Sequence, residues 1–275
     1  MSVLPGPVRT TGVHSMPRFT HRFFGVLLAL VTALGIASLA APAPAQAATR
    51  VTSWHVPVLM YHRIAPASER GGDLVDLVIA PTTFDAQLRA LKANGWHTIT
   101  AATLAAKMAA GQPVGYKTFV ITFDDGRADG YTHAFPVLRK YGFVATFYVI
   151  TGRVGGRTAI TWAQMKTMQA AGMEIGNHTV SHVQNLARIQ ADAQVAGAQM
   201  AILTDTGVAA QTLAYPFGFV CPNLVASVKA AGIKIAFTTA FGAKETWATR
   251  LLLPRVRIHP TTTASKIVAL LYPDR

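Results

Sequence analysis

The chain has 275 residues, of which 51% are hydrophobic, a formal net charge of +13 and a single cysteine, Cys221. This length suits one domain of roughly 200 to 250 residues plus an appendage. One cysteine excludes an intramolecular disulfide, so the fold must rest on its hydrophobic core.

The first element in the chain is an uncharged apolar segment at 23–41, which basic residues precede. The small-x-small pattern Ala45-Gln46-Ala47 follows it, as at the cleavage site of a secretory signal. Two prolines would break the helix just before this site and so favour cleavage after Ala47. An uncleaved anchor is the alternative, because the segment is long enough to span a bilayer. Met16 as the start would give a signal of more ordinary length.

These features predict a signal peptide at 1–47 and one domain at 48–275. The protein is then secreted or associated with the extracellular envelope, and it is tethered to the membrane if the apolar segment is retained. Removal of 1–47 takes away three arginines and no acid, which leaves 22 basic and 12 acidic residues and a net charge of +10. In an exported protein this charge favours an anionic surface, such as a cell envelope polymer, as a partner. Nucleic acid is disfavoured, because the basic residues are scattered and form no block.

Apolar runs typical of strands alternate with helical patterns along the rest of the chain. Strands are predicted at 56–64, 117–125, 143–150, 173–178, 233–239 and 252–258. Helices are predicted at 81–95, 130–142 with a kink at Pro136, 161–172, 183–206, 222–232 and 263–272. This alternation indicates a parallel α/β sheet or barrel, in which functional residues collect at the carboxyl ends of the strands.

Three motifs fall where a predicted strand gives way to a loop: TFDDG at 122–126, HTVSH at 178–182 and AYPFG at 214–218. Each is weak alone, because a histidine pair four residues apart is more often a solvated surface pair and Asp-Gly is ordinary turn chemistry. If a helix begins at His178, its ring and that of His182 lie on one face at a spacing suited to one metal ion. Two histidines and one carboxylate at neighbouring strand ends form a facial metal site with open positions. One aspartate of the pair would then bind the metal, while the other takes a proton from the attacking water.

In this order and on this α/β pattern, TFDDG, HTVSH and YPFG resemble the NodB-type polysaccharide deacetylases of carbohydrate esterase family 4. The resemblance runs from about 56 to 271. It implies a distorted (β/α) barrel that removes N-acetyl or O-acetyl groups from glycans. It also implies one divalent metal ion, usually zinc, with cobalt or nickel as alternatives.

The resemblance also assigns roles to residues of the three motifs. Asp124 corresponds to the general base, and Asp125, His178 and His182 correspond to the metal ligands. The backbone N–H of Phe217 corresponds to the donor that helps to hold the oxyanion.

The third motif departs from the family pattern, which has an arginine two residues before the proline. Ala214 occupies that position here, and Arg255 is the candidate that replaces the arginine in orienting the base. The late motif that supplies the acid is also unclear, because His259 in RIHP lies in the right region with the wrong neighbours.

With Ala214 in place of the arginine and PVLMYHRI at 57–64, the sequence is most similar to one subgroup of the family, the deacetylases of poly-β-1,6-N-acetylglucosamine. That match favours His62 over His259 as the general acid, with a satisfied core histidine as the structural alternative for His62. Tyr215 and Pro216 of the motif loop are expected to contact substrate, with the Tyr215 ring stacking on a sugar face.

The predicted function is therefore metal-dependent hydrolysis of N-acetyl groups on an extracellular N-acetylglucosamine-containing polysaccharide, with the poly-β-1,6-linked type favoured. Alternatives within this chemistry are a peptidoglycan or chitin-type deacetylase and an acetylxylan esterase. The alternative of another class is a glycan-binding protein that kept the fold and lost turnover. The presence of the base Asp124 together with all three metal ligands argues against this alternative, because a binding module does not need all four residues.

Overall fold

The computed structural model of the chain describes residues 50–69, 75–184 and 186–272. The predicted signal segment at 1–47 lies outside these residues. Within the described ranges, no helix is both long and apolar enough to cross a membrane.

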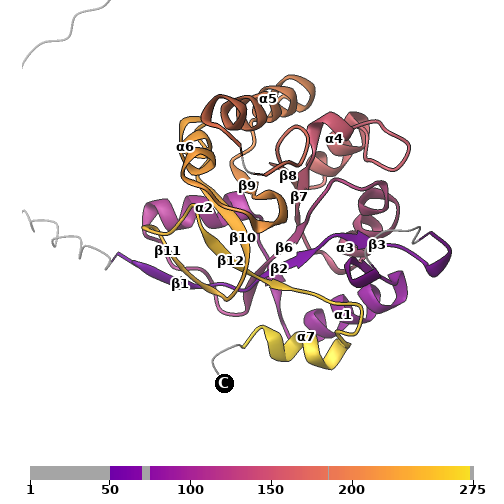
Figure 1. Cartoon of the computed structure of the whole chain (residues 1–275). Helices are drawn as coiled ribbons and strands as arrows, with labels where there is room; N and C mark the ends of the chain where they lie inside the picture. Colours follow the sequence, from indigo (N-terminus) through magenta and orange to yellow (C-terminus); the bar gives the residue numbers. More distant parts are fainter. Residues whose placement is uncertain (1–49, 70–74, 185, 273–275) are drawn as a thin grey trace, which may run out of the picture. The chain divides into compact units, whose positions relative to one another are not determined.

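A closed barrel of parallel strands forms the centre of the domain (Figure 1). Its strands pair in the order β2-β12-β10-β9-β8-β7-β6, and β6 pairs again with β2 to close the ring. The predicted distorted (β/α) barrel is therefore confirmed. The barrel strands are β2 (Val58–Tyr61), β6 (Thr118–Phe123), β7 (Thr146–Val149), β8 (Glu174–Asn177), β9 (Thr212–Ala214), β10 (Ile235–Phe241) and β12 (Leu253–Arg257).

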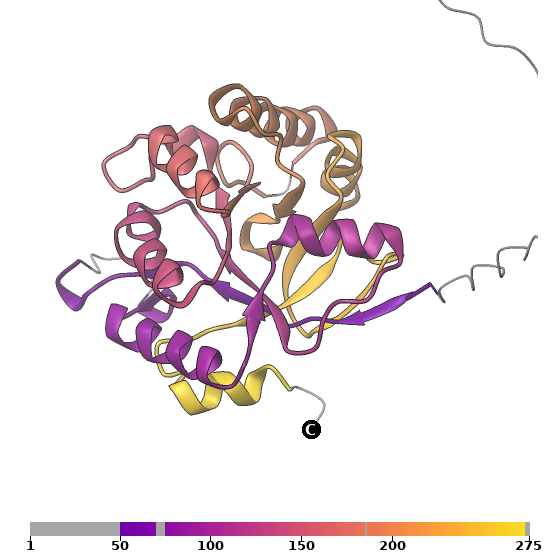
Figure 2. The ribbon, with the colours of Figure 1, turned by 180° about the vertical axis from the view of Figure 1, so that it is seen from behind.

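Helices surround the strands in both views of the ribbon (Figures 1 and 2). They are α1 (Pro81–Ala93), α2 (Ala101–Ala110), α3 (Phe135–Tyr141), α4 (Trp162–Ala170), α5 (Arg188–Thr206), α6 (Pro222–Ala230) and α7 (Ala264–Leu270). Five short strands flank the barrel: β1 (Ser53–His55), β3 (Arg63–Ile64), β4 (Val78–Ile79), β5 (His97–Thr98) and β11 (Lys244–Thr246).

The side chains of β6 alternate between two apolar clusters. Phe119, Ile121 and Phe123 belong to the large cluster between strands and helices, whereas Val120 belongs to the cluster inside the barrel. All six residues of the strand are buried, as expected of a strand covered on both faces. The inward phase of β6 continues into Asp124, which therefore enters the barrel at its carboxyl end.

Helix α2 closes the amino-terminal end of the barrel. Its apolar residues Leu104 and Met108 cluster with the first residues of β2, β10 and β12. The N–H groups of its first turn donate to Thr146 Oγ1 at 3.0 Å and to Glu174 Oε2 at 2.7 Å, at the starts of β7 and β8. The carboxyl ends of the strands are thus left as the place for the polar motifs.

Several predicted elements differ from those observed. The helix at 101–110 was not predicted from its alanine-rich sequence, although Thr100 caps it and Gly111 ends it with a φ of 65°. The predicted helix at 183–206 begins only at Arg188, and the predicted strand at 56–64 is interrupted at His62. The expected kink near Pro136 is a π-helical turn, Gly130–Ala134, that leads into α3.

Glu245 on β11 is fully buried and only half satisfied. Its Oε2 accepts from the N–H of Val56 at 3.1 Å, while Oε1 has no hydrogen-bond partner among the described residues. Burial raises the pKa of Glu245 to about 9. The folded protein therefore keeps this proton at pH values where the unfolded chain has lost it, so stability is highest below the ordinary pKa of a glutamate, falls as the pH rises, and stops falling above about 9.

We predict that Glu245→Gln removes one component of the pH dependence of stability. Between about pH 5 and pH 9, the free energy of unfolding of the parent should fall relative to that of the variant by up to about 1.4 kcal/mol per pH unit. Urea unfolding of both proteins at several pH values measures this difference. Parallel curves would contradict it.

Candidate active site

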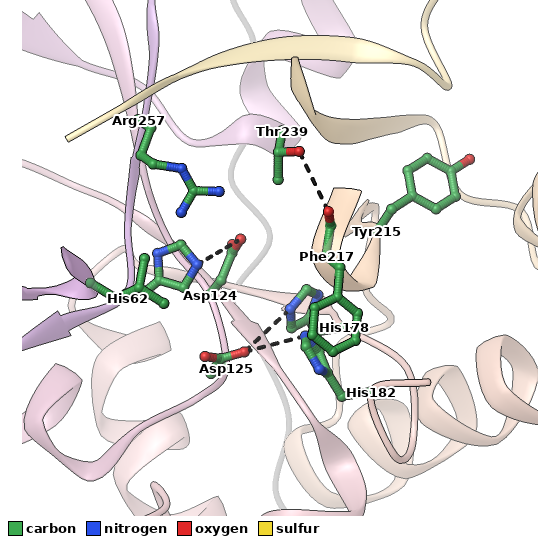
Figure 3. Close-up of a pocket in the computed structure, with 10 residues that line it drawn as sticks. His62, Asp124, Asp125, His178, His182, Tyr215, Phe217, Thr239 and Arg257 are labelled. Atoms are coloured by element: carbon green, nitrogen blue, oxygen red, sulfur yellow. Dashed lines mark hydrogen bonds and ion pairs between the residues drawn. The ribbon is translucent and has the colours of Figure 1, made fainter. Parts of the chain in front are cut away.

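A cavity of about 260 Å³ opens at the carboxyl ends of the barrel strands (Figure 3). It is lined by His62, Leu77, Asp124, Asp125, His178, His182, Tyr215, Phe217, Thr239 and Arg257. The cavity brings together residues from all three motifs and from the ends of β2, β10 and β12. The remaining predicted residues, Pro216, Arg255 and His259, lie outside its lining.

Asp124 forms a buried, bidentate salt bridge with Arg255. Arg255 Nη1 donates to Asp124 Oδ1 at 2.8 Å, and Nη2 donates to Oδ2 at 2.7 Å. The same guanidinium donates to Thr122 Oγ1 at 3.1 Å and to the Thr238 carbonyl at 3.0 Å, so partners on β6 and β10 fix its orientation. Burial alone would raise the pKa of Asp124, but the charge and hydrogen bonds of Arg255 outweigh it and hold that pKa below its usual range.

Asp125, His178 and His182 form a compact cluster beside this pair. Asp125 Oδ1 lies 3.5 Å from the Nε2 atom of each histidine, and the three ligand atoms lie within 4.8 Å of one another. The cluster contains two imidazoles and one carboxylate, a donor set that suits zinc or another divalent transition metal with open coordination positions.

The hydrogen bonds around the histidines fit a metal site. His178 Nδ1 lies 2.7 Å from the Ala214 carbonyl oxygen and donates to it, which leaves Nε2, the atom that faces Asp125, as the nitrogen that can ligate a metal ion. Ala214 occupies the position of the family's arginine, and here its backbone carbonyl orients the His178 ring. His182 Nε2 faces the same carboxylate oxygen.

All three motif loops contain strained backbone. Asp125, Thr179, His182 and Phe217 all have φ between 57° and 74°, a region that non-glycine residues rarely adopt. No helix begins at His178, because 178–182 is a loop, and the two histidines come together through the shape of that loop. Gln194 of α5 holds that loop in shape, since its Oε1 accepts from the N–H groups of Val180 and Ser181.

Gly126 permits the turn that follows the aspartate pair. Its φ is 61°, and a Cβ at this position would lie 3.2 Å from the Cα of Val149. A larger residue would therefore be both strained and crowded, which accounts for the glycine immediately after the two acids.

His62 is the histidine that lies beside the aspartate pair. Its Nε2 is 4.0 Å from Asp124 Oδ2. His259 instead lies in a turn after β12, where its backbone N–H donates to Thr262 Oγ1. Burial lowers the pKa of His62 below its usual value, although the charges of Asp124 and Asp125 act in the opposite direction.

The loop at 215–218 presents Phe217 rather than Tyr215. The Phe217 side chain is 62% exposed, and its ring centroid lies 4.4 Å from that of His182. The Tyr215 ring is fully buried among residues of α5 and α6 and points away from the cluster (Figure 3). The expectation that Tyr215 stacks on a sugar is therefore wrong, because its faces are covered. Pro216 is also buried, so it shapes this loop from within.

Sequence reasoning missed Arg257 and Thr239, which also line the cavity. Arg257 lies two residues after Arg255 on β12, and Thr239 lies two residues after Phe237 on β10. Alternate residues of a strand share a face, so the inward phase of each strand could have identified both. In the described part of the chain, the Arg257 guanidinium has no hydrogen bond or ion pair.

Comparisons with known proteins agree on one family. A family model described as polysaccharide deacetylase matches residues 111–236. A Bacillus subtilis protein named as a polysaccharide deacetylase, YxkH, is 30% identical over 214 residues, which cover 76% of this chain and 74% of that protein. The poly-β-1,6-N-acetyl-D-glucosamine N-deacetylase of Staphylococcus aureus is 24% identical over 226 residues, 73% of this chain and 77% of that enzyme.

Solved structures are similar over most of the domain. The Streptococcus pyogenes deacetylase PplD in complex with acetate matches with a TM-score of 0.74 and 27% identity, covering 81% of this chain and 99% of that one. IcaB from Ammonifex degensii matches with a TM-score of 0.70 and 26% identity, covering 81% of this chain and 99% of that one.

We predict that the cluster binds about one divalent ion, measured by calorimetric titration of the chelator-treated protein with zinc. His178→Ala and Asp125→Asn should each abolish tight binding, because each removes one of three ligands. Asp124→Asn should retain it, since that side chain is held by Arg255. Loss of binding in Asp124→Asn with retention in Asp125→Asn would show that the roles of the two acids are reversed.

Proposed function

The chain belongs to the polysaccharide deacetylase family, and on that premise we propose that it removes N-acetyl groups from an N-acetylglucosamine-containing polysaccharide outside the cell. The observation that supports this most strongly is that the two adjacent aspartates contact different groups. Asp124 is held by Arg255, and Asp125 faces two histidines. The name of the Staphylococcus aureus relative and the resemblance around His62 favour the poly-β-1,6-linked polymer.

The metal cluster and Asp124 have different functions in activating the attacking water. A divalent ion, when bound by Asp125, His178 and His182, supplies a Lewis acid and makes water nucleophilic near neutral pH. Asp124 accepts the proton of the attacking water at a carboxylate oxygen. Arg255 keeps Asp124 ionised and aims it, because both carboxylate oxygens are held by one planar guanidinium.

The backbone of the 215–218 loop stabilises the negative charge that develops on the acetyl oxygen during the reaction. As a C–O bond forms at that carbon, its carbonyl oxygen becomes negatively charged. The N–H of Phe217 is the proposed donor to this oxygen. The positive φ of Phe217, 59°, sets the direction of its peptide plane in this loop.

His62 is the proposed donor to the leaving amine. Its lowered pKa leaves it neutral in the resting protein at neutral pH, so it must gain a proton during the reaction. Asp124 Oδ2 lies 4.0 Å from His62 Nε2, so the proton that Asp124 accepts from water can pass to His62. When His62 Nε2 donates, the C–N bond breaks, acetate forms and the sugar keeps a free amine.

The proposal includes export. The apolar segment at 23–41 and the Ala45-Gln46-Ala47 pattern support a cleaved signal. The mass of the protein recovered from its native host would show whether cleavage follows Ala47 or whether the segment remains as an anchor.

The proposed activity is tested by acetate release from a panel of acetylated polymers. We expect release from an N-acetylglucosamine polymer, with poly-β-1,6-N-acetylglucosamine ahead of chitin oligomers and peptidoglycan and with acetylxylan last. Loss of release on chelation, restored by zinc, cobalt or nickel, is expected from the cluster. Binding of these polymers with no acetate release under any metal would instead support a glycan-binding protein.

His62→Ala separates the two candidate acids. We predict that it lowers kcat for the amide by about 10²- to 10⁴-fold, the usual contribution of proton transfer, with metal content unchanged. An activated ester should lose much less, because its leaving group needs no proton. His259→Ala is the matched control and should change neither rate. A large loss in His259→Ala with none in His62→Ala would reverse the assignment.

A further inference from the structure

A second cavity of about 330 Å³ adjoins the first, and Asp125 lines both. Its other lining residues come from the 126–128 turn and from the 151–160 loop. They are Arg127, Gly152, Arg153, Val154, Gly156, Thr158 and Ala159. Apart from Asp125, the only charged side chains in this lining are two arginines.

The 151–160 loop is tied to both motif loops that carry the metal cluster. The N–H groups of Thr151 and Gly152 donate to the carbonyls of Thr179 and Val180 at 3.1 and 2.9 Å. The N–H of Ile160 donates to the Gly126 carbonyl at 3.0 Å, and Arg127 and Ala159 form an isolated bridge. The loop is therefore held in a definite place beside the cluster.

Gly152 makes the contact with the histidine loop possible. A Cβ at this position would lie 2.7 Å from the Val180 carbonyl oxygen, a backbone atom that cannot move aside without shifting the histidine loop. The residue next to this close approach is Arg153, whose position in the cavity wall is thus determined by the backbone.

Arg153 brings a positive charge without a partner. In the described part of the chain, its guanidinium forms no ion pair or hydrogen bond. Arg257 brings a second unpaired guanidinium to the first cavity. The nearby acids are engaged, since Asp124 is paired with Arg255 and Asp125 belongs to the metal cluster. Once a divalent ion is bound, the surroundings of the cluster are therefore positive, which favours an anionic ligand.

We propose that this second cavity is a subsite for a sugar that carries a carboxylate, next to the sugar that loses its acetyl group, and that Arg153 binds the carboxylate. The inference rests on the proposed deacetylase function and adds that, on whichever N-acetylglucosamine backbone reacts, a chain with an acidic neighbouring sugar reacts faster than its neutral counterpart. An arginine fork matches a carboxylate with two parallel hydrogen bonds. The hydroxyl of Thr158, in the same lining, is a further donor.

The test compares matched oligosaccharides on whichever backbone releases acetate in the polymer panel. One carries an ether-linked carboxylate at O3 of the neighbouring sugar, as in muramic acid. A second has a neighbouring uronic acid, and the methyl ester of each is its uncharged control. We expect kcat/KM to be about 3- to 10-fold higher for an acid than for its ester at low salt, mainly through KM. The larger preference identifies which acid the subsite takes, and added salt should reduce it.

Two variants assign the preference to this cavity. In Arg153→Gln the acid-to-ester ratio should fall toward one. In Arg157→Gln the ratio should persist, because Arg157 is an exposed residue of the same loop that does not line the cavity. Equal kcat/KM for acid and ester in the parent, or an unchanged ratio in Arg153→Gln, would overturn the subsite and leave deacetylation intact. Absence of acetate from every backbone would overturn the proposed function itself.

Discussion

The ion pair between Asp124 and Arg255 joins the interior of the barrel to its chemistry. A fully buried guanidinium is stable only when its donors are satisfied, and here a carboxylate, a hydroxyl and a carbonyl satisfy them. The carboxylate directly follows β6 and the guanidinium lies on β12, with β2 pairing between these two strands. The contact that orients the proposed base therefore also links the two strands that flank β2. Removing one partner of such a buried pair typically costs about 3 to 5 kcal/mol.

The polar motifs and the barrel class could be predicted from the sequence because they are local. The acid pair, the histidine pair and the alternation of strands and helices each lie within a short stretch. The backbone of the histidine loop could not be predicted that way, since Gln194 from α5 holds the residues that lie between its two positive-φ positions. The orientation of Tyr215 was also beyond sequence reasoning, because its ring packs against helices that follow and precede it in the chain.

Helix α2 was missed for a related reason. Its alanine-rich sequence has only two large apolar residues, Leu104 and Met108, to mark a buried face, and the surface it covers consists of strand beginnings from distant parts of the chain. Conversely, the missing arginine of the third motif was noticed from the sequence, and its spatial substitute was sought on β12. Strand phase explains why that substitute reaches Asp124, since Leu253 and Arg255 lie on the same inward face.

Because the amino-terminal end of the barrel is closed, substrate and products must enter and leave at the carboxyl-terminal end. With α2 packed across the strand beginnings, a small product formed beside Asp124 departs on the side where the polymer lies. Acetate and glycan thus share one route. A bound glycan chain therefore lies over the same end of the barrel from which the acetate leaves.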